Sequence, residues 1–198
     1  MNYLAHAYLS FNDPSIVIGN MISDVVKGKQ KFDYPAAIQK GIMLHRAIDE
    51  FTDSHEVTRH AKMYFKIPYR LYAGAFVDIV YDHFLANDKN QFINEKSLYT
   101  FSQSTYTILG NNTAFLPPKF LHMLPYMKEQ NWLYGYRLKE GIEKSFVGMV
   151  SRAAYLSDAT EAYNLFIKYY DELSQCYNEF FPALKDFTLY QLSQNGNK

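Results

Sequence analysis

The chain has 198 residues, of which 48% are hydrophobic, and its 20 basic residues balance 20 acidic ones. This length suits one folded unit, so we expect a single domain over residues 1–198. A formal net charge of zero argues against nucleic acid or a membrane surface as a partner, and no run approaches the roughly 18 apolar residues of a membrane span. A single cysteine, Cys176, excludes an intramolecular disulfide framework and favours a cytoplasmic location.

Apolar residues recur at helical spacing along almost the whole chain, which predicts an all-α fold arranged as one irregular helical bundle. Proline, glycine and asparagine mark the breaks between helices. Pro182 is expected to interrupt the last long helix. The expected helices cover residues 2–11, 15–27, 35–53, 55–65, 69–87, 91–109, 118–130, 137–152 and 157–181.

Two of these helices carry acidic residues and histidines at helical spacing. His45, Asp49 and Asp53 follow one another at steps of four, and so do Asp78 and Asp82, the latter followed directly by His83. Residues four apart share one face of a helix. We therefore expect two polar faces that converge.

The first two helices add His6, Asn20 and Asp24. Asp24 lies in an otherwise apolar stretch and needs a partner, and Asn20, one turn earlier, faces the same side. Carboxylates that meet in a cleft repel one another, and a divalent cation relieves this repulsion. Mixed imidazole and carboxylate ligands suit Mn²⁺, Fe²⁺ or Zn²⁺, while carboxylates also suit Mg²⁺. The alternative is a solvated helix surface, where charged residues four apart are common.

Several segments resemble the acyl carrier protein phosphodiesterase family, which is related to the HD-type metal phosphohydrolases. The matching segments are Met1 to His6, Gly19 to Asp24, Gly41 to Asp49 with Thr52-Asp53, and Tyr81 to Leu85. The resemblance implies an HD-like helical fold, a divalent metal, most often Mn²⁺, and removal of 4'-phosphopantetheine from holo-acyl carrier protein. The adjacent His-Asp pair of the wider HD superfamily is absent, because Arg46 follows His45 and only the reversed Asp82-His83 occurs.

On this basis we hypothesise a role for each polar residue. Arg46 would pair with the phosphate, His83 would donate a proton to the leaving serine, and Asp24 would serve catalysis as well as metal binding. The expected metal ligands are His6, Asp24, His45, Asp78 and Asp82, oriented by Asn20, Asp49 and Asp53. Holo-acyl carrier protein is implied to be acidic, and Lys27, Lys29, Arg59 and Lys62 are expected to bind it.

Two other functions remain open at this point. An HD-like phosphohydrolase that acts on a nucleotide or another small phosphoester would use the same residues. A non-catalytic helical module would bind a carrier protein or another partner without needing a metal.

Overall fold

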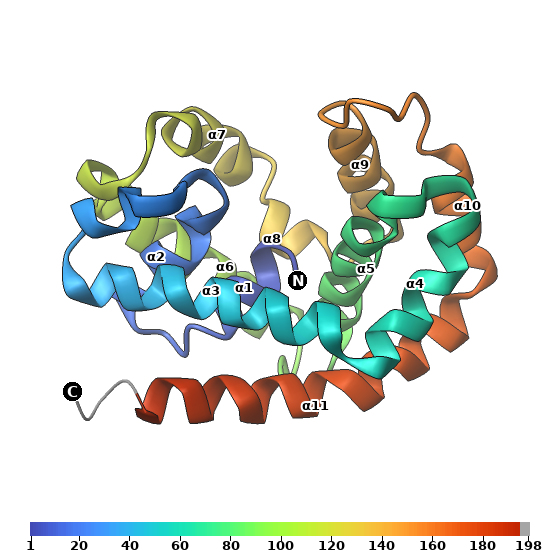
Figure 1. Ribbon diagram of the computed structural model, residues 1–198, viewed down its shortest axis with the longest axis horizontal. Helices are drawn as coiled ribbons and strands as arrows, with labels where there is room; N and C mark the ends of the chain where they lie inside the picture. The colour runs from blue at the N-terminus through green and yellow to red at the C-terminus, as the bar shows by residue number, and fades with distance from the viewer. Residues whose placement is uncertain (195–198) are drawn as a thin grey trace.

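The computed structural model describes residues 1–194, and their regular secondary structure is entirely helical (Figure 1). This confirms the predicted all-α class. The last four residues of the predicted single domain lie outside the described part. The helices are α1 (Tyr3–Tyr8), α2 (Pro14–Ile22), α3 (Ala36–Ser54), α4 (Glu56–Tyr69), α5 (Ala73–Asn87), α6 (Glu95–Asn111), α7 (Pro118–Glu129), α8 (Trp132–Gly135), α9 (Lys139–Val150), α10 (Thr160–Lys168) and α11 (Tyr170–Gln194), with short 3-10 helices η1 (Ser23–Val25), η2 (Gly28–Asp33), η3 (Arg70–Tyr72) and η4 (Thr113–Phe115).

Several helix starts are encoded locally. The Asp13 side chain accepts hydrogen bonds from the amides of Ser15 and Ile16, and Pro14 takes the first position of α2. Asn94 caps α6 by accepting from the Ser97 amide. Side chains of this kind satisfy amides that have no partner in the first turn, and proline at the first position loses no helical hydrogen bond.

Helices α2 and α3 cross with their backbones in contact. A Cβ atom added at Gly41 would lie 2.5 Å from the carbonyl oxygen of Ile16 and 2.9 Å from Cα of Gly19. Only glycine permits such an approach, because any side chain at these two positions would push the helices apart. The crossing places Asn20 of α2 directly against His45 of α3, whose Nδ1 lies 2.7 Å from the Asn20 carbonyl oxygen.

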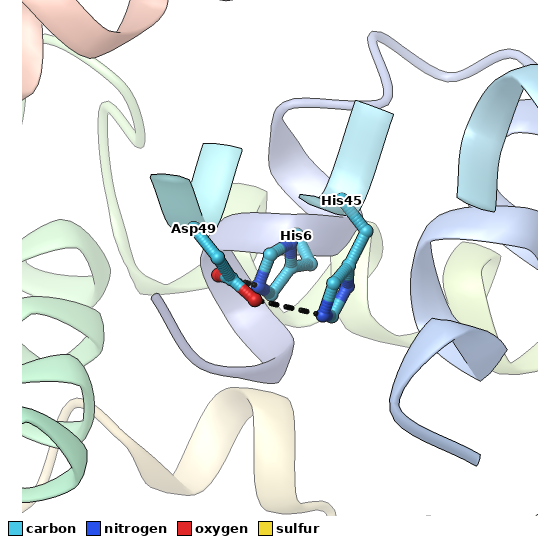
Figure 2. Close-up of side chains that lie close together, drawn as sticks. All are labelled: His6, His45 and Asp49. Atoms are coloured by element: carbon cyan, nitrogen blue, oxygen red, sulfur yellow. Dashed lines mark ion pairs between the residues drawn. The ribbon is translucent and has the colours of Figure 1, made fainter. Parts of the chain in front are cut away.

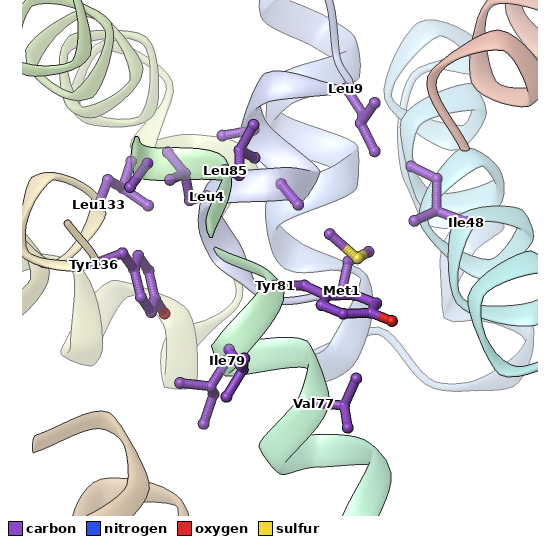
Figure 3. Packing of buried hydrophobic residues seen from close by; sticks show 14 of the residues in the cluster. Met1, Leu4, Leu9, Ile48, Val77, Ile79, Tyr81, Leu85, Leu133 and Tyr136 are labelled. Atoms are coloured by element: carbon purple, nitrogen blue, oxygen red, sulfur yellow. The ribbon is translucent and has the colours of Figure 1, made fainter. Parts of the chain in front are cut away.

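Aromatic rings fill the core between the helices that follow. Phe76 of α5 lies 5.7 Å from Phe65 of α4 and 5.0 Å from Phe146 of α9, measured between ring centroids, and all three are fully buried. Figure 3 shows another part of this core, in which Met1 and Leu4 pack near Tyr81 and Leu85 of α5. The buried start of the chain therefore lies at the centre of the molecule (Figure 1).

Three predicted helices differ clearly from those of the structure, and the helix expected over 55–65 continues through Pro68 to Tyr69 as α4. The helix expected over 15–27 ends at Ile22 and gives way to η1, so Asp24 lies on a 3-10 turn. The helix expected over 157–181 is divided into α10 and α11, and α11 continues through Pro182. Phe180, Phe181 and Leu184 are buried on either side of this proline. Their packing outweighs the hydrogen bond that proline removes, which explains why the predicted break does not occur.

Helix α11 runs along one edge of the molecule, beneath α3 in Figure 1. It joins the two ends of the bundle, since it packs against both α3 and α4. Within residues 1–194, no helix has the length and apolar character that a membrane crossing requires.

Candidate metal centre

Three side chains from α1 and α3 converge at one point (Figure 2). Nε2 of His6 lies 3.2 Å from Oδ1 of Asp49, and Nε2 of His45 lies 3.1 Å from Oδ2 of the same carboxylate. One donor atom of each residue lies within 4.8 Å of the donors of the other two. The two imidazole rings stack with their centroids 3.8 Å apart. We call His6, His45 and Asp49 the central triad.

Asn20 fixes the orientation of both histidines. Its side-chain nitrogen donates to the carbonyl oxygen of His6 and to the Ser10 hydroxyl, so its side-chain oxygen faces Nδ1 of His6 at 2.8 Å. Its backbone carbonyl faces Nδ1 of His45 at 2.7 Å. Because a carbonyl oxygen only accepts, each Nδ1 must carry the proton. The Nε2 atoms of both rings are therefore turned toward Asp49, the orientation that metal-ligating histidines require.

Asp24 approaches the triad from the solvent side. Its Oδ1 lies 3.1 Å from Nε2 of His45, and its side chain is 67% exposed, whereas His6 and His45 are buried. The short turn of η1 directs Asp24 toward α3, because a 3-10 turn follows directly on the α2–α3 crossing. Asp24 is thus the exposed acidic member of the site.

The electrostatics of the site favour a positive charge between the carboxylates. Burial lowers the pKa of His45, but hydrogen bonds to Asp24 and Asp49 outweigh it and raise that pKa to about 9. Burial and the neighbouring His45 lower the pKa of His6 to about 4. Burial opposes ionisation of Asp49, yet the two histidines hold its pKa well below the usual range.

In the neutral His6 ring, Nε2 carries no proton and faces two oxygen atoms. Nε2 of His6 lies 3.2 Å from Oδ1 of Asp49 and 3.2 Å from the carbonyl oxygen of Met1, and both of these oxygens only accept. Two stacked imidazoles cannot both be charged without strong repulsion, and His45 is the one that takes the proton. A lone pair directed at two acceptors is unfavourable, and a divalent cation placed among these atoms would bind all of them. The residues present thus fit a metal ion.

The structure does not bring Asp78 and Asp82, both predicted as ligands, into the central triad. Asp82 is fully buried and accepts hydrogen bonds from the amides of Leu4 at 2.7 Å and Ala5 at 3.2 Å, which anchors the start of α1. Asp78 pairs with the N-terminal ammonium of Met1 at 3.0 Å. Both acids were expected to face α3, but α5 turns them toward the first residues of the chain.

His83, predicted as a proton donor, also lies outside the central triad. Its Nδ1 lies 2.8 Å from the Tyr136 carbonyl oxygen and its Nε2 lies 2.9 Å from the Tyr170 hydroxyl. Adjacent helical residues point about 100° apart, so the face of α5 that places Asp82 at α1 sends His83 toward α8 and α11. Both of its ring nitrogens are occupied by these contacts.

Asp53 does not orient the ligands as predicted. It lies two turns beyond His45 on α3, roughly 12 Å along the helix axis. Its carboxylate forms an exposed ion pair with Lys62 at 2.7 Å. This pair also engages Lys62, one of the four residues expected to bind the substrate.

The remaining residues predicted to contact the substrate are Arg46, Lys27, Lys29 and Arg59. A guanidinium nitrogen of Arg46 donates to the carbonyl oxygen of Val26, which holds Arg46 beside the loop that carries Asp24. Lys27 and Lys29 are exposed at the start of η2, close to Asp24 in sequence. Arg59 is exposed on α4.

Two members of the site have stronger roles than the sequence indicated. Asp49 was assigned to orient ligands, yet it contacts both histidines of the triad; its position one turn after His45 was the available signal. The Met1 ammonium, buried 3.5 Å from Asp49 and 3.0 Å from Asp78, was not identified at all. No spacing rule predicts it, because it contacts these residues only through the fold.

Known proteins that are similar to this chain match it over a region that contains the central triad. A family model described as acyl carrier protein phosphodiesterase matches residues 1–184. Proteins with that name from Serratia proteamaculans, Enterobacter sp. and Yersinia pestis are 31%, 30% and 29% identical to the chain, over 93% of it and 95% of each relative. No solved structure gave a significant match, so the HD-like relationship stays a prediction.

Proposed function

Because the chain belongs to the acyl carrier protein phosphodiesterase family, we propose that it hydrolyses holo-acyl carrier protein to apo-acyl carrier protein and 4'-phosphopantetheine. The relatives that carry this name match it over nearly their whole length. The central triad offers a site for such chemistry in the same matched region. The cytoplasm is the location we propose, since buried Cys176 is the sole cysteine and forms no disulfide.

We further propose that His6, His45 and Asp49 hold a divalent cation, with Mn²⁺ as the first candidate and Mg²⁺, Fe²⁺ or Zn²⁺ as others. The observation that supports this most directly is that Nε2 of His6 lies 3.2 Å from each of two oxygens that only accept, Oδ1 of Asp49 and the carbonyl oxygen of Met1. Imidazole together with carboxylate suits these transition metals. A bound cation supplies a Lewis acid that lowers the pKa of a coordinated water and polarises a phosphoryl oxygen.

The protein groups around the triad have distinct tasks in the proposed reaction. Water attacks phosphorus, the bond from phosphorus to the serine oxygen breaks, and that oxygen takes up a proton. Asp24 is exposed and lies beside the triad, with Oδ1 3.1 Å from Nε2 of His45, so it is placed to accept the proton of the attacking water and pass it to the serine oxygen. Arg46, held at the Val26 carbonyl, is placed to pair with a phosphate oxygen.

Lysines that closely follow Asp24 in the sequence are suited to an acidic carrier protein. Lys27, Lys29 and Lys31 lie on or next to η2, directly after the turn that carries Asp24. Complementary charge of this kind accelerates encounter and loses its effect as salt is added. Arg59 and Lys62 lie on α4, and the Asp53 ion pair engages Lys62, so we place the main docking charge on η2.

The proposal is tested by incubating the protein with holo-acyl carrier protein and weighing the carrier by intact mass spectrometry, with added Mn²⁺ and with a chelator. Loss of the phosphopantetheine mass with Mn²⁺, and not with the chelator, is expected. Turnover of a nucleotide or a small phosphoester instead would assign the chain to another phosphohydrolase activity. No turnover and no bound metal by elemental analysis would favour a binding module.

A matched pair of variants locates the metal. Asp49→Ala removes the carboxylate that contacts both histidines and should lower turnover by at least about 10–100-fold, the loss that follows removal of even a residue that only orients a metal ligand. Asp53→Ala changes the same residue type one turn later on the same helix and should leave turnover within about twofold, because its ion pair is exposed. Equal effects of the two variants would contradict the proposed ligand set.

A further inference from the structure

A cavity of about 710 Å³ opens beside Asp24. One wall comes from the η1 and η2 region and includes Val25, Lys27 and Tyr34. The opposite wall comes from the segment between α6 and α7 and includes Leu116 and Pro117. These two segments are far apart in sequence, so the fold alone forms this cavity, which we call the Asp24 cavity.

The Asp24 cavity adjoins the central triad, because Asp24 belongs to one and contacts the other. Asp24 lines it and also approaches Nε2 of His45 to 3.1 Å. A phosphodiester seated on the central triad would therefore have one of its two ester groups beside the cavity. The other ester group, to the serine of the carrier protein, would lead out of the cavity to the solvent side, where Asp24 is exposed.

The volume of the Asp24 cavity and the residues that line it indicate which ester group of the phosphodiester enters it. Cavities of roughly 300–1,000 Å³ hold ligands of small-molecule size, whereas a folded carrier protein is far too large to enter one. Val25, Leu116 and Pro117 offer apolar contacts, while Gln30 and the ammonium groups of Lys27 and Lys119 add polar ones. A slender chain with methyl and methylene groups, two amides and a phosphate at one end matches this mixture.

We propose that the Asp24 cavity binds the pantetheine arm of the substrate, with its phosphate at the central triad and its thiol end between η2 and the segment before α7. The inference rests on the proposed function, because it takes holo-acyl carrier protein as the substrate. It assigns selectivity for the arm to residues 114–117 and 25–34, outside the triad. Free 4'-phosphopantetheine, the product, would occupy the same cavity.

Neighbouring residues of η4 provide a matched test. Ala114 lines the cavity and is exposed, so Ala114→Trp would fill the cavity without disturbing the core. Thr113 is equally exposed and does not line it, which makes Thr113→Trp the control. Ala114→Leu adds a smaller obstruction and gives a graded comparison. All three should keep the wild-type melting temperature within about 2 °C, because exposed substitutions have small effects on stability.

Two measurements decide the outcome. Ala114→Trp should raise KM for holo-acyl carrier protein by at least about tenfold, Ala114→Leu by less, and Thr113→Trp by less than about twofold. In metal-free protein, binding of pantetheine followed by calorimetry should weaken in the same order, and this readout does not need activity. Wild-type kinetics and pantetheine binding in Ala114→Trp would refute the cavity assignment.

Failure of the two proposals can be told apart. If the wild-type protein with Mn²⁺ leaves holo-acyl carrier protein intact, the proposed function fails. If the wild-type protein is active and Ala114→Trp behaves like Thr113→Trp, the function stands and the cavity assignment fails. Should Ala114→Trp not fold, Ala114→Leu alone must show the raised KM and the weaker pantetheine binding, and its absence counts against the proposal.

Discussion

The α2–α3 crossing predicts that Gly41→Ala will weaken both the fold and the metal centre. The new Cβ would lie 2.5 Å from the Ile16 carbonyl oxygen, 2.9 Å from Cα of Gly19 and 3.0 Å from Cα of Ile16. Comfortable contacts between heavy atoms begin near 3.5 Å, so the helices must separate by about 1 Å. The methyl group has no flexible neighbour to displace, since all three atoms belong to the backbone.

The expected loss of stability follows from two opposing terms. Overpacking of this kind costs about 1–3 kcal/mol. Alanine returns up to about 1 kcal/mol, because it favours the helix more than glycine does. The net loss is up to about 2 kcal/mol, which corresponds to a fall in melting temperature of up to roughly 8 °C for a chain of this size.

The same displacement reaches the metal centre. His45 lies one turn after Gly41, and its Nδ1 is held 2.7 Å from the carbonyl oxygen of Asn20 on α2. A separation of about 1 Å would break this hydrogen bond and release the His45 ring, and loss of such an orienting contact lowers metal affinity by about 10–100-fold. Titration with Mn²⁺ and thermal unfolding monitored by circular dichroism measure the two effects.

Gly148→Ala in α9 is the matched control. The nearest atom to its added Cβ is a guanidinium nitrogen of Arg152, on a flexible side chain at 3.5 Å. This variant should gain about 0.5–1 kcal/mol and bind metal like the wild type. If Gly41→Ala is as stable as Gly148→Ala and binds Mn²⁺ with wild-type affinity, the close crossing does not position the site.

Three further changes test other parts of the structure. Phe76→Ala removes a fully buried ring packed against Phe65 and Phe146 and should cost about 3–5 kcal/mol by urea denaturation; a cost below about 1 kcal/mol would contradict the described core. Burial raises the pKa of Asp82 to about 7, so the folded state holds its proton more tightly than the unfolded chain does. The free energy of unfolding should therefore fall as pH rises from about 4 to 7, and Asp82→Asn should flatten that slope, whereas an unchanged slope would refute the assignment. Mn²⁺ at 100 times its Kd should stabilise the protein by about 2.7 kcal/mol, a rise in melting temperature of about 5–11 °C that a chelator reverses and Asp49→Ala abolishes.

Several residues of the site were predictable because helical spacing survives in any tertiary arrangement. His45 and Asp49 share a face of α3 whatever surrounds that helix, and Nε2 of His45 lies 3.1 Å from Oδ2 of Asp49. Asn20 and Asp24 were expected near the same pocket, and contacts to His45 place both of them there. The ligand set predicted from sequence differs from the central triad at Asp78 and Asp82, because the sequence does not show which face of α5 meets which neighbour.

The sequence by itself determined the all-α class, most helix positions and the polar residues of α1, α2 and α3, because periodicity and turn chemistry are local properties. Only the tertiary structure decided that Asp82 anchors α1, that His83 bonds Tyr170, and that α11 continues through Pro182. These outcomes depend on packing between segments far apart in the chain. No spacing rule encodes such contacts, because each joins residues that only folding brings together.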